Sequence, residues 1–147
     1  MRFWTQEWFD AMKVQSTKDE DYMKKTKRFS TKVQVLLTNT PGTTGPDRVD
    51  ALLNDMTFEK GKLIAGEITE KPMPADWRSM PFDDKKYLVR LVSSYDDYVK
   101  VMKSEVTPMN AIAGGTLQIV GDRMKVMAIM GELLAFIALL QSLSCEY

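Results

Sequence analysis

The chain has 147 residues with 20 basic and 20 acidic side chains, so its formal net charge is zero and it lacks the basic excess typical of nucleic-acid-binding domains. This length suits one domain, residues 1–147, with a hydrophobic core of its own. Histidine is absent, which removes the commonest general base and metal ligand, and the single cysteine, Cys145, cannot form an internal disulfide. We therefore expect a protein that is not an enzyme, with no metal site and no cofactor.

Two helices are predicted at the start of the chain. Thr5 can cap the first, whose apolar face is formed by large side chains at helical spacing. These side chains are Trp4, Trp8, Phe9 and Met12. We interpret them as contacts that hold the helix on the domain, with a ligand or membrane contact as the alternative. Thr17 and Glu20 form a capping box that predicts the start of the second helix.

Three strands are predicted next. Apolar and polar residues alternate over residues 33–37, which indicates the first strand. Residues 39–47 contain two prolines and two glycines and are predicted to form a loop. Residues 49–58 and 63–70 have strand-like sequences, and the short turn between them predicts a hairpin.

The middle of the chain contains a segment of unusual composition. Residues 71–84 are rich in proline and aromatic side chains, among them Trp77 and Phe82. Because proline cannot donate a backbone hydrogen bond, this segment is not a central strand, and we interpret it as an ordered flap. Residues 87–92 are apolar on both faces except at Arg90, which predicts a strand in the middle of the sheet.

Capping residues and glycines delimit the elements of the last third. Ser94 and Thr107 can each cap a helix, and the glycine pair at 114–115 can end the second of these helices. Residues 117–120 alternate in polarity and predict a short strand. Asp122 can then cap the final helix with its side-chain oxygen.

The final helix is predicted to be a single, unusually apolar element. Between residues 126 and 140 the only strongly polar side chain is Glu132, and methionines recur at Met124, Met127 and Met130. A helix that is apolar all round needs cover on most sides. Three kinds of cover would serve: the rest of the domain, another chain, or a bound apolar ligand. A membrane span is a weaker alternative, because it needs about 20 apolar residues.

A run of residues before this helix reads Pro108-Met109-x-Ala111, followed by Gly115-x-Leu117-x-Ile119-x-Gly121-Asp122. This run resembles the signature of the sterol carrier protein type 2 family. The resemblance implies an α+β fold with a single mixed, mostly antiparallel sheet of about five strands. It further implies that helices cover one face of the sheet, that the apolar C-terminal helix closes a hydrophobic tunnel, and that the domain has no chemistry of its own.

The apolar helix and the resemblance together predict non-catalytic binding or transfer of a lipid-like hydrophobic molecule, such as a fatty acid, acyl-CoA, isoprenoid or sterol-like compound. Methionine side chains suit a site of loose specificity because they repack easily. For each candidate lining residue, packing in the core is the alternative role. The candidates are Met102, Met109, Ile112, Leu117, Ile119, Met127, Met130, Leu134 and Ile137, with Trp77 and Phe82 from the flap.

The alternative function is an interaction or oligomerisation domain, in which the C-terminal helix packs on a second copy or on another protein without a bound ligand. As partners we expect a lipid-like small molecule and no nucleic acid. Transient contact with a membrane surface and a homodimer are further options. The first nine residues lack the basic start and apolar core of a signal peptide, so we expect a cytoplasmic location.

Overall fold

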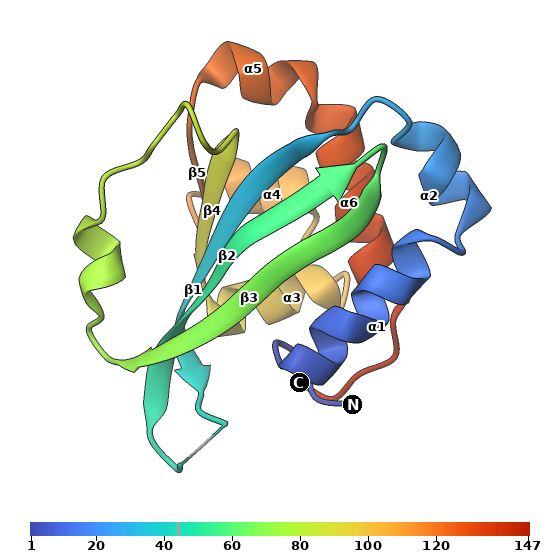
Figure 1. Cartoon of the computed structure of the whole chain (residues 1–147). Coiled ribbons are helices and arrows are strands. Elements are labelled where there is room, and N and C mark those ends of the chain that lie inside the picture. Colours follow the sequence, from blue (N-terminus) through green and yellow to red (C-terminus); the bar gives the residue numbers. More distant parts are fainter. Residues whose placement is uncertain (44) are drawn as a thin grey trace.

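The computed structural model describes residues 1–43 and 45–147. Its helices are α1 (Gln6–Ser16), α2 (Glu20–Lys25), α3 (Tyr95–Met102), α4 (Pro108–Ala113), α5 (Arg123–Ala128) and α6 (Met130–Ser142), with a 3-10 helix at Asp76–Ser79. Its strands are β1 (Thr31–Pro41), β2 (Arg48–Glu59), β3 (Lys62–Pro72), β4 (Val89–Ser94) and β5 (Leu117–Val120). Figure 1 shows these elements in chain order around one sheet.

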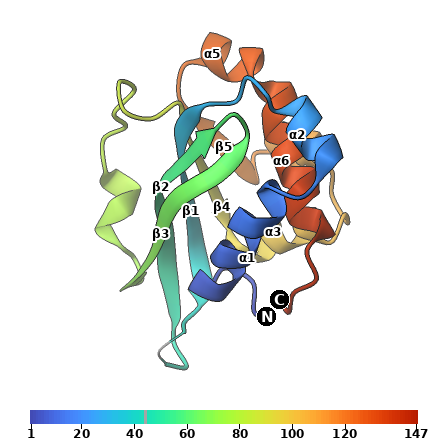
Figure 2. The same ribbon diagram turned by 45° about the vertical axis from the view of Figure 1, so that its right-hand side comes forward.

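Within these residues the strands form one five-stranded sheet in the order β3-β2-β1-β4-β5. The β1–β4 pair is parallel, and the other three pairs are antiparallel. Helices α1, α2, α3 and α6 lie on one face of the sheet, while the segment between β3 and β4 lies on the other (Figure 2). The prediction of a mixed, mostly antiparallel α+β sheet with helices on one face is confirmed.

The helix starts follow from the capping residues. Predicted caps accept backbone hydrogen bonds at the start of four helices: Thr5 from Trp8, Ser94 from Asp97, Thr107 from Asn110, and Asp122 from Met124. The second helix is the exception, because its cap is Asp19 and not Thr17. The Thr17 hydroxyl donates instead to the carbonyl oxygen of Val14 at 2.7 Å and so serves the end of α1.

Several strand boundaries differ from the predictions; β3, for example, runs to Pro72, two residues into the predicted flap. β1 continues to Pro41, where a loop was predicted, because Thr40 pairs with Val49 beyond an irregularity in the ladder at Asn39. The N–H of Asn39 donates to the buried carboxylate of Asp50 at 3.1 Å, which replaces the interrupted ladder contact. β4 begins at Val89, two residues later than predicted, and lies between β1 and β5 as expected for a strand in the middle of the sheet.

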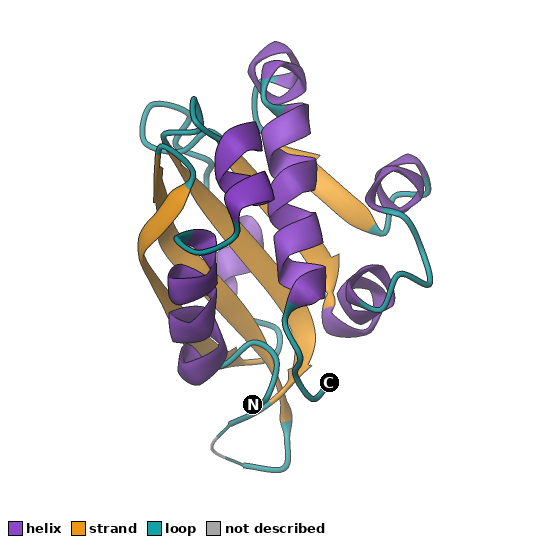
Figure 3. Ribbon diagram, turned by 90° about the vertical axis from the view of Figure 1, so that its right-hand side faces the viewer, coloured by secondary structure: helices purple, strands orange, loops and turns teal. Residues whose placement is uncertain are grey.

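The final apolar segment is not one helix. It is divided at Ile129, whose φ of −114° and ψ of 14° end α5 and place α6 on a new axis. The prediction of a single final helix was therefore wrong. Isoleucine is not a helix-breaking residue, so the sequence gives no sign of the break. The break separates α5, which carries exposed methionines, from α6, which packs on the sheet (Figure 3).

Helix α1 approaches β3 closely because Gly66 has no side chain. A Cβ atom added to Gly66 would lie 2.5 Å from Cζ of Phe9 and 3.3 Å from Cδ1 of Leu53. Both neighbours are fully buried, so neither side chain can move aside easily.

We expect Gly66→Ala to lower the free energy of unfolding by about 1–3 kcal/mol, because it overpacks this contact. Urea denaturation measures the change. Gly131→Ala is the matched control, since no atom lies within 4 Å of its added Cβ and the residue is in a helix. That variant should be neutral or more stable by about 0.5–1 kcal/mol. Equal destabilisation by both variants would contradict the proposed contact.

Candidate functional site

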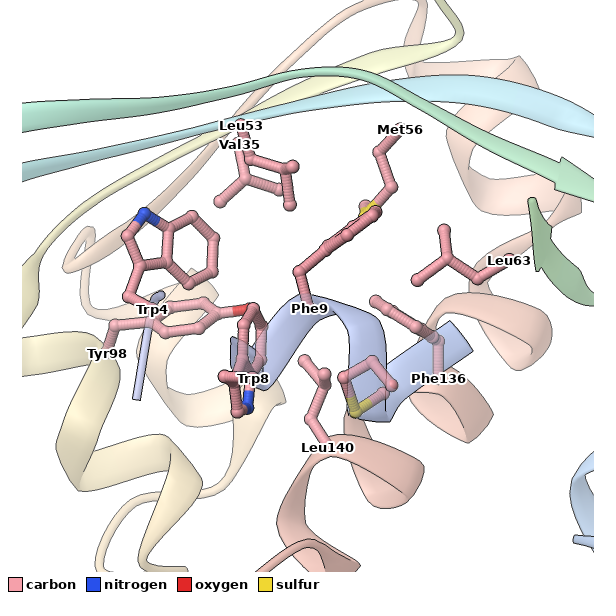
Figure 4. Close-up of a pocket in the computed structure, with 11 residues that line it drawn as sticks. Trp4, Trp8, Phe9, Val35, Leu53, Met56, Leu63, Tyr98, Phe136 and Leu140 are labelled. Carbon is pink, nitrogen blue, oxygen red and sulfur yellow. The ribbon is translucent and has the colours of Figure 1, made fainter. Parts of the chain in front are cut away.

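The space between the sheet and α6, where a tunnel was expected, is filled by side chains. The cavity found there has a volume of about 10 Å³, which is room for about one water molecule. The rings of Phe9 and Phe136 project into this space from α1 and α6, beneath Leu53 and Met56 of the sheet (Figure 4). The expected lipid-sized tunnel is therefore not shown, because aromatic rings occupy the interior.

The larger apolar space is a groove that is open to solvent. It has a volume of about 600 Å³ and lies between α4, the edge strand β5, and the α5–α6 segment. This volume falls within the range of about 300–1,000 Å³ for small-molecule sites. Its lining residues are Met109, Ile112, Gly115, Leu117, Gln118, Ile119, Val120, Gly121, Arg123, Val126, Met127 and Met130. We call this space the apolar groove.

Local structure explains how the three walls of the groove are placed. Thr107 and Pro108 start α4, and Gly115, with a φ of +81°, allows the chain to leave this helix and enter β5. Gly121 then has a φ of +152°, and a Cβ atom there would lie 2.7 Å from the carbonyl oxygen of Leu88. Only glycine fits this approach, so the chain can turn directly from β5 into α5.

Six of the predicted lining residues come together in this groove: Met109, Ile112, Leu117, Ile119, Met127 and Met130. The other five lie elsewhere. Met102 and Ile137 are buried in the core on the helix side of the sheet, and Leu134 lies half-buried on α6. Trp77 and Phe82 belong to the flap on the opposite face, where the Phe82 ring lies 5.6 Å from the guanidinium of Arg90.

Several residues that line the groove were not among the predicted ones. Val126 lies on α5, four positions before Met130 and on the other side of the break at Ile129, and it falls outside the three-residue spacing of the methionines. Gln118 and Val120 alternate with Leu117 and Ile119 and would normally face the other side of a sheet. They reach the groove because β5 is an edge strand, whose free side is open to both faces.

The rim of the groove is apolar and exposed. Met127 is 69% exposed and Met109 is 52% exposed, while Met124, next to the groove on α5, is 83% exposed. Arg123 is the charged residue among the lining residues. Soluble domains seldom leave large apolar side chains clustered in water without a binding role.

Metal-binding groups and membrane-spanning helices are two further features that bear on function. Among residues 1–43 and 45–147, no group of three or more histidine, cysteine, aspartate or glutamate side chains could hold a metal ion. Over the same residues, none of the helices has both the length and the apolar character needed to cross a membrane.

Comparison with solved structures identifies the fold. A crystal structure of sterol carrier protein 2 superposes with a TM-score of 0.69 at 14% identity, covering 97% of this chain and 100% of that one. A conserved hypothetical protein of Thermus thermophilus, described as a candidate sterol carrier protein, gives a TM-score of 0.70 at 14% identity, with 99% and 92% covered. The ubiquinone synthesis protein UbiJ-SCP2 gives 0.51 at 11% identity, with 96% of both chains covered.

No protein-family model matches the sequence, and a search of curated proteins gives no match. The resemblance seen in residues 108–122 is nevertheless confirmed at the level of the fold, because the structural matches cover almost the whole chain. At identities of 11–14% the likeness shows a shared fold and leaves ligand and activity to be argued from the residues themselves.

Proposed function

We propose that this protein binds a lipid-like hydrophobic molecule in the apolar groove and that it does so without catalysing a reaction. The observation that carries the proposal is the groove itself, about 600 Å³ in volume and lined mainly by methionine and branched aliphatic side chains. The fold shared with sterol carrier protein 2 supports it.

The hydrophobic effect supplies the binding energy. An acyl chain that buries about ten methylene groups gains roughly 8 kcal/mol on leaving water, against which the cost of immobilising the ligand must be set. Methionine side chains have several rotatable bonds and adapt to ligands of different shape. We therefore expect preference for apolar chains of suitable length and weak discrimination between related compounds.

Met127→Asp tests the groove directly. Met127 is largely exposed in the free protein, so the substitution should leave the fold intact while it places a carboxylate in the lining. We expect the dissociation constant for a fluorescent fatty acid to rise at least about tenfold, because an apolar contact is lost and a charge must be desolvated. Fluorescence titration with a competing unlabelled ligand measures it.

Met124→Asp is the matched control for this variant. It introduces the same charge three positions earlier on α5, at a residue that does not line the groove. We expect its affinity to stay within about twofold of the original, because the Met124 side chain is 83% exposed and a charge placed there stays hydrated. Equal loss in both variants, or no saturable binding by the original protein, would refute the proposal. Mass spectrometry of molecules released on denaturation would identify the natural ligand.

An interaction domain is the second candidate, and the exposed methionine rim favours it as well. The same apolar surface at Met109, Met124 and Met127 can be covered by another chain. One protein of similar fold, 11% identical to this chain, is described as a ubiquinone synthesis protein. Analytical ultracentrifugation separates the two proposals. A monomer at micromolar concentration that binds the fatty acid supports the ligand proposal, whereas a dimer that Met127→Asp dissociates supports the interaction domain.

A further inference from the structure

A second hollow lies on the opposite face of the sheet, beneath the flap (residues 71–84). Its volume is about 330 Å³, at the lower end of the range of about 300–1,000 Å³ for small-molecule sites. Leu36 and Val92 of the sheet, Trp77 of the flap and Val120 of β5 supply its apolar lining. Thr38, Gln118, Arg78 and Arg90 are its polar and charged lining residues. We call it the flap pocket.

The charge of Arg78 is neutralised within the protein. Asp50, whose side chain is completely buried, accepts hydrogen bonds from Nε and Nη2 of Arg78, both at 2.9 Å. Asp50 also accepts from the backbone N–H of Ala75 at 2.9 Å. This arrangement attaches the first half of the flap to β2 and leaves no net charge from the Arg78–Asp50 pair.

Arg90 is different, because its charge has only neutral partners. The residue is 6% exposed, and its Nε donates to the Gln34 side chain at 3.0 Å. Its Nη1 and Nη2 donate to the backbone carbonyls of Met80 and Pro81 at 2.8 and 3.1 Å. The ion pairs among residues 1–43 and 45–147 do not include Arg90.

This arrangement leaves both charge and hydrogen-bonding capacity for a ligand. Three of the five N–H groups of the Arg90 guanidinium are used, so two are free to donate. With Arg78 cancelled by Asp50, the flap pocket has one uncompensated positive charge. A buried cation without a counter-ion is costly, and an anion that enters the pocket removes this cost.

We propose that the flap pocket binds a small monocarboxylate with an apolar body, whose carboxylate accepts hydrogen bonds from Arg90 and whose body contacts Leu36, Val92 and Trp77. A carboxylate matches both the single charge and the planar guanidinium. A phosphate dianion would introduce a second negative charge that nothing in the apolar wall compensates. The flap pocket and the apolar groove share Gln118 and Val120 of the edge strand β5, whereas Leu36, Val92, Trp77 and Arg90 line the flap pocket alone.

The test compares two probes of the same length, octanoate and neutral octanamide, in titrations followed by amide and indole NMR shifts. We expect octanoate to shift Leu36, Val92 and the Trp77 indole in a saturable manner. Octanamide should bind at least about tenfold more weakly, because it lacks the charge-assisted hydrogen bonds. Equal affinity of the two probes, or shifts confined to groove residues such as Ile112 and Met130, would overturn the proposal.

Two variants separate the pocket from the apolar groove. In Arg90→Gln, octanoate and octanamide should bind with equal affinity. The ratio of the two affinities is measured on one variant, so a change in how tightly the flap is attached affects both probes alike. Val92→Phe narrows the pocket while keeping Arg90 and should weaken octanoate binding at least about tenfold. Met127→Asp, which places a charge in the groove instead, should leave it unchanged. Octanoate binding that survives Val92→Phe but not Met127→Asp would place the ligand in the groove and refute the flap pocket.

Discussion

Phe9→Ala should lower the free energy of unfolding by about 3–5 kcal/mol, the range found when a buried aromatic ring is removed from a packed core. Phe9 is 1% exposed, and its ring contacts Gly66 of β3 while it fills the space beside Phe136. Urea denaturation measures the loss. Val14→Ala on the same helix is the control, because Val14 is 51% exposed and its truncation should have little effect.

The same variant tests where an apolar ligand binds. Removing the Phe9 ring enlarges a cavity that now holds only about 10 Å³, so Phe9→Ala should gain affinity for a small apolar probe such as benzene. Its affinity for a fluorescent fatty acid should be unchanged if that ligand occupies the apolar groove. A large change in fatty-acid affinity would instead indicate that the ligand enters the core and displaces the rings.

Asp50→Ala should lower the free energy of unfolding by about 3 kcal/mol and release the flap. The substitution removes the acceptor of the buried N–H of Ala75, and leaving a buried donor unpaired costs about 1–3 kcal/mol. The N–H of Asn39, an exposed residue, loses its acceptor as well. Arg78 loses its partner as well, but its side chain is 46% exposed and can be hydrated. Denaturation measures the stability, and limited proteolysis within residues 71–84 reports release of the flap.

The control for this variant is Asp76→Ala. Asp76 pairs with Lys71 at 3.0 Å within the same segment, but the pair is exposed to solvent, so its loss should be hardly measurable. A flap that remains protected from proteases in Asp50→Ala would show that the apolar contacts of Trp77 hold it without the buried carboxylate.

The contribution of Asp50 also depends on pH. Burial raises the pKa of the Asp50 carboxyl, but hydrogen bonds from Arg78, Ala75 and Asn39 lower it more, so the net pKa in the folded protein lies below its ordinary value. A lowered pKa stabilises the fold at pH values above the unfolded-state pKa of about 3.9, and this stabilisation is lost as the pH falls through the folded-state pKa. The stability difference between the original protein and Asp50→Asn should therefore be constant near neutral pH and shrink in acid.

Local signals in the sequence determined much of the fold. The caps at Thr5, Ser94, Thr107 and Asp122 were predicted because a capping hydrogen bond spans only two or three residues. Alternation predicted the strands, and the motif of residues 108–122 indicated the fold that the structural matches confirm. Six residues that were predicted to line a tunnel lie together in the groove, because α4, β5 and the next helix are adjacent in the chain.

The tertiary structure alone decided which spaces are filled and which are open. Phe9 and Phe136 line the same small cavity, and Asp50 binds Arg78, although the members of each pair are far apart in the sequence. No local pattern shows that rings will occupy the interior. The break at Ile129 and the position of Trp77 across the sheet have the same origin. Periodicity records how apolar a face is, whereas packing between distant elements determines whether that face meets the core, a ligand or water.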